Sequence, residues 1–99
     1  MPVTERQRRH LKGLAHHLKP VVIVGQAGVS QAVLDELGTS LDNHELIKVK
    51  VNAGDREERQ RMIGQITGHT QAQLIDSIGH VIVLFRANPK KKQPMSLPV

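Results

Sequence analysis

The sequence predicts a single α/β domain in which helices and strands alternate and then end in a strand hairpin. Apolar residues recur at helical spacing in three segments, and short β-branched runs separate these segments. The last two strand-like segments are joined by Gly79-His80, a turn dipeptide. The order helix, strand, helix, strand, helix, strand, strand favours a partly parallel sheet whose last two strands pair antiparallel. With 99 residues, the chain has room for one core.

The first helix is expected over about residues 4–18. Thr4 and Gln7 have the spacing of a capping box, and Pro20 ends the helix. One apolar stripe follows the cap and consists of Leu11, Leu14, Ala15 and Leu18. A different side of the helix carries Arg9, Lys12, His16 and Lys19. The first helix is therefore expected to be amphipathic, with a cationic outer side.

The middle of the chain predicts two strands around a second helix. The β-branched run 21–24 predicts a strand that is buried on both faces. Ser30 is the expected N-cap of a helix over about residues 31–42. The run 46–51 then alternates, so that three apolar side chains share one face and Lys48 and Lys50 lie on the other with Leu46.

The last third of the chain predicts a helix, a hairpin and a tail. Asp55 and Glu58 open a third helix, which ends between residues 68 and 70. Residues 72–78 predict a weak strand and residues 81–85 a strong one. Prolines and a lysine run follow, without periodicity. We therefore expect residues 1–87 to form the domain and residues 88–99 to form a flexible basic tail.

The charge distribution indicates a polyanionic partner. Fourteen Lys and Arg exceed nine Asp and Glu, which gives a formal net charge of +5. The excess lies at both ends, because Glu5 is the only acid among residues 1–20 and Lys90, Lys91 and Lys92 are consecutive. Phe85 is the only aromatic residue, which argues against modules that stack bases on several rings. Nucleic acid is the candidate partner, with simple solubility as the alternative reading of the charge.

Several functional classes lack support in the sequence. There are no cysteines, which excludes disulfides, zinc fingers and thiol catalysis. No apolar run is long enough for a membrane span, and the absence of a secretion signal favours a cytoplasmic location. His10, His16 and His17 have no acidic or thiol ligand at short spacing, and no serine has a nucleophile context. We expect no catalytic residue, no metal, no cofactor and no small-molecule substrate.

The loop Gly25-Gln26-Ala27-Gly28 is the sharpest local motif. It joins a strand to a helix start, where backbone N–H groups attract anions, and its glycines would let a sugar-phosphate backbone approach closely. The motif completes neither a P-loop nor a dinucleotide fingerprint, and an ordinary tight turn is the alternative. The candidate RNA-binding residues are Gly25, Gln26, Ala27 and Gly28 in the loop, with Lys19, Lys12, Arg9, His16, Lys48 and Lys50 around it.

Taken together, the motifs resemble those of the CRM (YhbY) family. The matching segments, in their usual order, are 11–16 (LKGLAH), 18–22 (LKPVV), 25–28 (GQAG), 44–50 (HELIKVK), 78–79 (IG) and 84–86 (LFR). The resemblance covers about residues 4–86. The sequence departs from the family at Gln26 and Ala27, where many members carry Lys or Arg, and at Gln71, where glycine is usual.

The resemblance implies both a fold and a function. The implied fold has two layers with a four-stranded mixed sheet and is similar to the C-terminal domain of a bacterial translation initiation factor. The implied function is binding to ribosomal RNA in precursors of the large (50S) ribosomal subunit, with a role in ribosome assembly. The implied site is the 25–28 loop and its basic surroundings. We expect a cytoplasmic monomer with RNA as its partner; the alternative is a protein-interaction adaptor whose basic charge is incidental.

Overall fold

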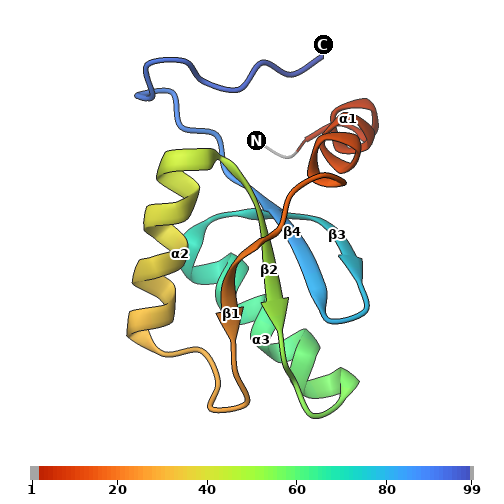
Figure 1. Cartoon of the computed structure of the whole chain (residues 1–99), viewed down its shortest axis with the longest axis vertical. Coiled ribbons are helices and arrows are strands. Elements are labelled where there is room, and N and C mark those ends of the chain that lie inside the picture. The colour runs from red at the N-terminus through yellow and green to blue at the C-terminus, as the bar shows by residue number, and fades with distance from the viewer. Residues whose placement is uncertain (1–2, 99) are drawn as a thin grey trace.

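The computed structural model describes residues 3–98, which form three helices and one four-stranded sheet (Figure 1). In chain order the elements are α1 (Glu5–Ala15), β1 (Pro20–Val24), α2 (Gln31–His44), β2 (Leu46–Val51), α3 (Arg56–Thr70), β3 (Gln73–Ile78) and β4 (Val81–Phe85). The predicted α/β class and element order are confirmed. No helix within the described residues is long and apolar enough to cross a membrane.

The sheet is mixed and has the strand order β1-β2-β4-β3. β1 and β2 run parallel, with α2 connecting them, whereas β4 pairs antiparallel with both β2 and β3. Because β1 and β2 run parallel, their carboxyl ends lie at the same edge of the sheet. The loop after β1 and the start of α3 therefore come together there, at the lower end of the molecule in Figure 1.

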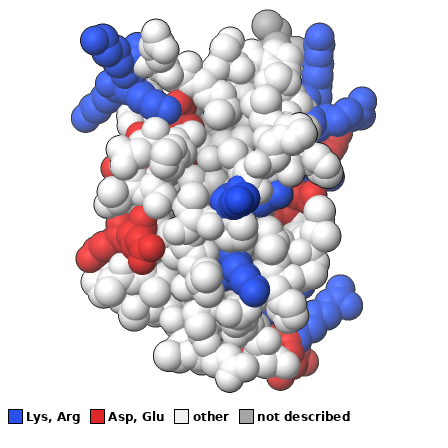
Figure 2. All heavy atoms as spheres, in the orientation of Figure 1, with Lys and Arg blue, Asp and Glu red and all other residues white. Residues whose placement is uncertain are grey.

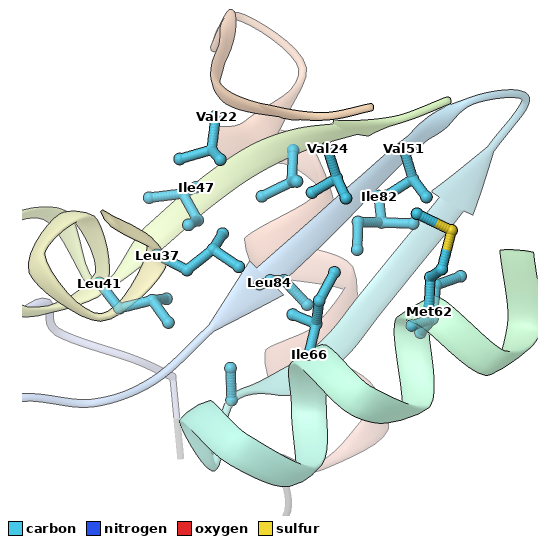
Figure 3. Packing of buried hydrophobic residues seen from close by; sticks show 13 residues of the cluster. Val22, Val24, Leu37, Leu41, Ile47, Val51, Met62, Ile66, Ile82 and Leu84 are labelled. Atoms are coloured by element: carbon cyan, nitrogen blue, oxygen red, sulfur yellow. The ribbon is translucent and has the colours of Figure 1, made fainter. Parts of the chain in front are cut away.

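The main core lies between the sheet and the helices α2 and α3. Figure 3 shows Leu37 and Leu41 of α2 and Met62 and Ile66 of α3 projecting towards the sheet. The strands contribute Val22, Val24, Ile47, Val49, Val51, Ile82 and Leu84 to this core. Each such side chain contributes roughly 1.5–3 kcal/mol when it is fully buried.

The opposite face of the sheet is covered in part by α1. A second cluster joins the two, and its buried members are Leu11, Ala15, Leu46, Ile75, Val83 and Phe85. Arg8 fastens α1 to β3, because its Nη1 donates to the carbonyl oxygens of Leu74 at 2.7 Å and Ile75 at 2.9 Å. Beyond the two layers implied by the resemblance, the sheet thus carries α1 on its second face.

The expectation that the first strand is buried on both faces is wrong. Val22 and Val24 are buried, but Val21 is 47% and Ile23 is 62% exposed. β1 is an edge strand, and the buried residues that pack with α1 come from β2, β3 and β4. The apolar stripe of the first helix is likewise only half buried, because Leu14 is 42% and Leu18 is 38% exposed. α1 ends at Ala15, so Leu18 lies beyond the helix.

The segment after β4 contacts the domain at several points, through Asn88, Met95, Leu97 and Pro98, and one of its partners is a buried carboxylate. Glu45, the C-cap of α2, is 1% exposed and has a positive φ of 62°. Its carboxylate accepts hydrogen bonds from the backbone N–H groups of Asn88 at 2.9 Å and Met95 at 2.8 Å, and Lys91 Nζ lies 3.8 Å from it. These contacts give residues 88–98 a defined path. The predicted flexibility of residues 88–99 concerns the motion of this segment and stays a prediction. Met1, Pro2 and Val99 lie outside the described residues.

Candidate functional site

Lys48 and Lys50 stand on the face of the sheet opposite α2 and α3, as the alternation of β2 predicts. β2 is a central strand, and Lys48 lies between Pro20 of β1 and Val83 of β4 in the register. Lys50 is exposed and Lys48 is partly buried. The two lysines lie on the same face, roughly 7 Å apart along the strand. The sheet backbone therefore fixes the spacing of the two lysine Cα atoms and directs both side chains to the same face.

The end of α1 brings further basic residues to Lys48. Lys12, His16 and Lys48 line one hollow of about 500 Å³ between α1 and the sheet. Asp76 of β3 lines the same hollow, with its Oδ1 4.0 Å from Lys12 Nζ. A partly exposed ion pair of this length is weak, worth roughly 0–1 kcal/mol, so Lys12 remains available to a stronger anion.

Lys19 lies on the other side of Lys48, in a second groove. The two lysines line a groove of about 490 Å³ whose walls include Leu14, Leu18 and Val21. Lys48 lines both this groove and the hollow beside α1, which makes it the common member of the arrangement. We call Lys12, Lys19, Lys48 and Lys50 the sheet patch. Figure 2 shows cationic atoms near the middle of a largely uncharged face as well as at its margins.

The 25–28 loop lies at the far end of β1 from Lys19. Lys19 directly precedes β1 and the loop directly follows it, so the strand separates them by roughly 16 Å. The loop is a tight turn in which Gly28 N–H donates to the carbonyl oxygen of Gly25 at 3.1 Å. Gly28 has φ +98°, which favours glycine, and no atom beyond its two chain neighbours lies within 4 Å of the Cβ that a side chain would add there. The loop therefore presents open backbone to the solvent.

Arg61 is a basic residue at the loop that sequence reasoning missed. It lines a hollow of about 340 Å³ with Gln26, Ala27 and Gly28, and Gln65 lies one helical turn further along α3 in the same hollow. Arg61 supplies a positive charge beside a loop that carries none of its own, and Glu58 lines the same hollow with a negative charge. The sheet topology could have revealed it. Because β1 and β2 run parallel, the loop after β1 and the first turns of α3 lie at the same end of the two strands. We call residues 25–28 with Arg61 the loop site.

The predicted residues therefore divide between two places. Lys12, His16, Lys19 and Lys48 line the adjoining hollows at the α1 end of the sheet, and the glycine loop lies at the opposite end. Lys50 stands between them, because it pairs with Ile23 one residue before β1 ends. Arg9 is exposed on α1 and lines none of these three hollows.

Other basic residues serve the fold. Arg86 donates from Nη1 to the Thr70 carbonyl oxygen at 2.7 Å, and from Nη2 to the Gly38 carbonyl oxygen at 3.0 Å and to Asp42 Oδ1 at 2.7 Å. It joins α2, the end of α3 and the end of β4. Arg8 is similarly occupied by carbonyl groups of β3. Among residues 3–98, no three His, Asp or Glu side chains form a group that could hold a metal ion.

Comparison with known proteins places these features in a family. The family model described as the CRS1/YhbY (CRM) domain matches residues 3–86. A Haemophilus influenzae protein named an RNA-binding protein is 45% identical over 96 residues, covering 97% of this chain and 95% of its own length. A Pseudomonas aeruginosa protein named a probable RNA-binding protein is 38% identical over 96 residues, covering 97% and 92%.

A solved structure agrees with the fold. The solution structure of a Staphylococcus aureus protein, described as a candidate RNA-binding protein, superposes with a TM-score of 0.82 and 29% sequence identity. The match covers 98% of this chain and 100% of that protein. The likeness in fold therefore extends over almost the whole of both chains.

Proposed function

This protein belongs to the CRS1/YhbY (CRM) domain family, and we propose that it binds RNA through the sheet patch and the loop site. The observation that carries the proposal is the gathering of Lys12, Lys19 and Lys48 around adjoining hollows on one face of the sheet. Relatives that match over nearly the whole chain are named as RNA-binding or probable RNA-binding proteins, which supports it.

The sheet patch and the loop site make different contacts with the RNA. Lysine ammonium groups act as point charges on phosphates and release counterions when they bind. The glycine loop contributes close approach of backbone N–H groups, with Arg61 as its local cation. Both kinds of contact position the RNA backbone and read no base sequence. The protein acts by binding alone, without a catalytic step or a cofactor.

The RNA that we propose is ribosomal RNA within precursors of the large ribosomal subunit, so that the protein takes part in ribosome assembly in the cytoplasm as a monomer. The support is the match of residues 3–86 to the family model, together with bacterial relatives that the chain matches over more than nine tenths of their length. An assembly factor needs to bind and leave, and a modest set of phosphate contacts suits this because it limits the affinity.

The test is sedimentation of the protein in a gentle lysate at low salt. We expect it to travel with precursor large-subunit particles, and crosslinking should map its contacts to ribosomal RNA. Protein found only at the top of the gradient would contradict the assembly role. Salt separates RNA binding from a protein-interaction adaptor, because RNA affinity falls steeply as salt rises whereas an adaptor's affinity falls much less.

A further inference from the structure

We infer that the groove between the end of α1 and strands β1 and β2 holds an unpaired nucleobase of the bound RNA. The inference rests on the proposed RNA-binding function and adds the kind of RNA element that this site recognises. The groove has a volume of about 490 Å³, within the range of roughly 300–1,000 Å³ that small-molecule sites occupy. The space is therefore large enough for a base with its ribose.

The walls of the groove are apolar side chains that the fold leaves exposed. Leu14, Leu18 and Val21 line it and are 42%, 38% and 47% exposed. Leu46 forms part of its floor. A small domain normally buries residues of this kind, and here they gather where α1 has ended and β1 is left uncovered. Burying them against an apolar partner would stabilise a complex.

The rim of the groove carries only positive charge. Lys19 and Lys48 line it, and no Asp or Glu does. An occupant that matches both properties has a flat, weakly polar body and an adjacent negative group. A nucleotide has this combination, since the base would lie against the leucine and valine side chains while its phosphate meets the ammonium groups.

Only an unpaired base can enter such a groove. In an A-form duplex the bases are stacked and paired, and a protein meets mainly phosphates and 2′-hydroxyls. In loops and bulges the bases can turn outward to a protein surface. Other proteins usually stack such bases on aromatic rings, but the single Phe, Tyr or Trp here, Phe85, is 2% exposed, and among the residues that line the groove only His44 has a ring. The aliphatic groove takes over that task, which favours looped RNA over fully paired RNA.

The experiment compares two RNA probes on the full chain. One is a hairpin with 2-aminopurine in its loop, and the other is a blunt duplex with the same number of phosphates and 2-aminopurine in a base pair. The groove variants are Leu18→Gln and Val21→Thr. Ile23→Thr is the matched control, because Ile23 lies two residues further along β1, is 62% exposed and does not line the groove. A melting curve accompanies each variant.

We expect each groove variant to bind the hairpin about tenfold more weakly than the parent, with duplex affinity unchanged. The fluorescence change of the looped 2-aminopurine should also be lost. Ile23→Thr should match the parent on both probes. If the groove variants bind both probes like the parent, the inference is refuted while RNA binding stands. Groove variants that keep both RNA affinities but lose binding to an acidic amphipathic peptide would assign the groove to a protein and also refute it. No binding of either probe by the parent would refute the proposed function itself.

Discussion

Replacing Glu45 by Gln should destabilise the domain, because its buried carboxylate accepts two backbone hydrogen bonds from the C-terminal segment. Both of its oxygens accept backbone N–H groups, from Asn88 at 2.9 Å and from Met95 at 2.8 Å, and the residue is 1% exposed. Glutamine keeps the size but offers one acceptor oxygen, and its NH₂ group faces the second N–H. One hydrogen bond to a charged group is lost, which is worth roughly 1.5–3 kcal/mol. In a domain of this size each kcal/mol shifts the Tm by roughly 4–8 °C, so we expect a fall of about 10 °C.

The assay is thermal unfolding by circular dichroism together with amide hydrogen exchange. Asp42→Asn is the matched control, because Asp42 lies nearby on α2 but its side chain is 64% exposed. Losing the charge of an exposed ion pair should lower the stability by less than about 1 kcal/mol. In the parent, the amides of Asn88 and Met95 should exchange slowly, and Glu45→Gln should make them exchange fast. An unchanged Tm, with both amides already exchanging fast in the parent, would refute the reasoning and leave residues 88–98 as the flexible tail that the sequence predicts.

Three further predictions concern residues of the sheet patch and the loop site. Lys48→Ala should lower RNA affinity mainly at low salt and reduce the slope of log affinity against log salt by roughly 0.7–0.9 per lost phosphate contact, measured by a salt titration. Gly28→Ala should lower the Tm, because its φ of +98° strains any side chain by roughly 1–3 kcal/mol, whereas Gly25→Ala should leave the Tm nearly unchanged. Arg61→Ala should weaken RNA binding at constant Tm, and equal affinities for it and the control Arg56→Ala would remove Arg61 from the loop site.

Local patterns predicted most of the fold because its elements carry strong local signals. The capping box at Thr4 and Gln7 is formed, and Asp55 caps α3 as expected. The β2 alternation correctly separates core side chains from lysines. The sequence predicted the end of α3 only to within residues 68–70, because no glycine stands at the C-cap position. Gln71 takes the left-handed conformation there, with φ 63°, at the position where the family usually has glycine.

The exposure of single side chains, and which residues lie close together in space, were harder to predict because both depend on how distant elements are arranged. The run 21–24 is apolar throughout, and only its place at the sheet edge leaves Val21 and Ile23 uncovered. The structure brings Lys12, Lys19 and Lys48 together around adjoining hollows, and their role in RNA binding stays a prediction. Lys19 and the glycine loop are close in sequence but lie at opposite ends of β1. Arg61 is distant in sequence and reaches the loop only because β1 and β2 run parallel.

The lysines of β2 also restrict how the sheet can assemble. In the native pairing with β4, Lys48 faces Val83 and Lys50 faces Val81, with Ile47 and Val49 turned towards the helices. If β2 slipped by one residue, every side chain would exchange faces and both ammonium groups would enter the core. Burying an unpaired charge costs several kcal/mol, so competing pairings are disfavoured while the chain folds. Lys48 and Lys50, which we propose to contact RNA, therefore also favour the strand pairing in which the helices pack against the other face of β2.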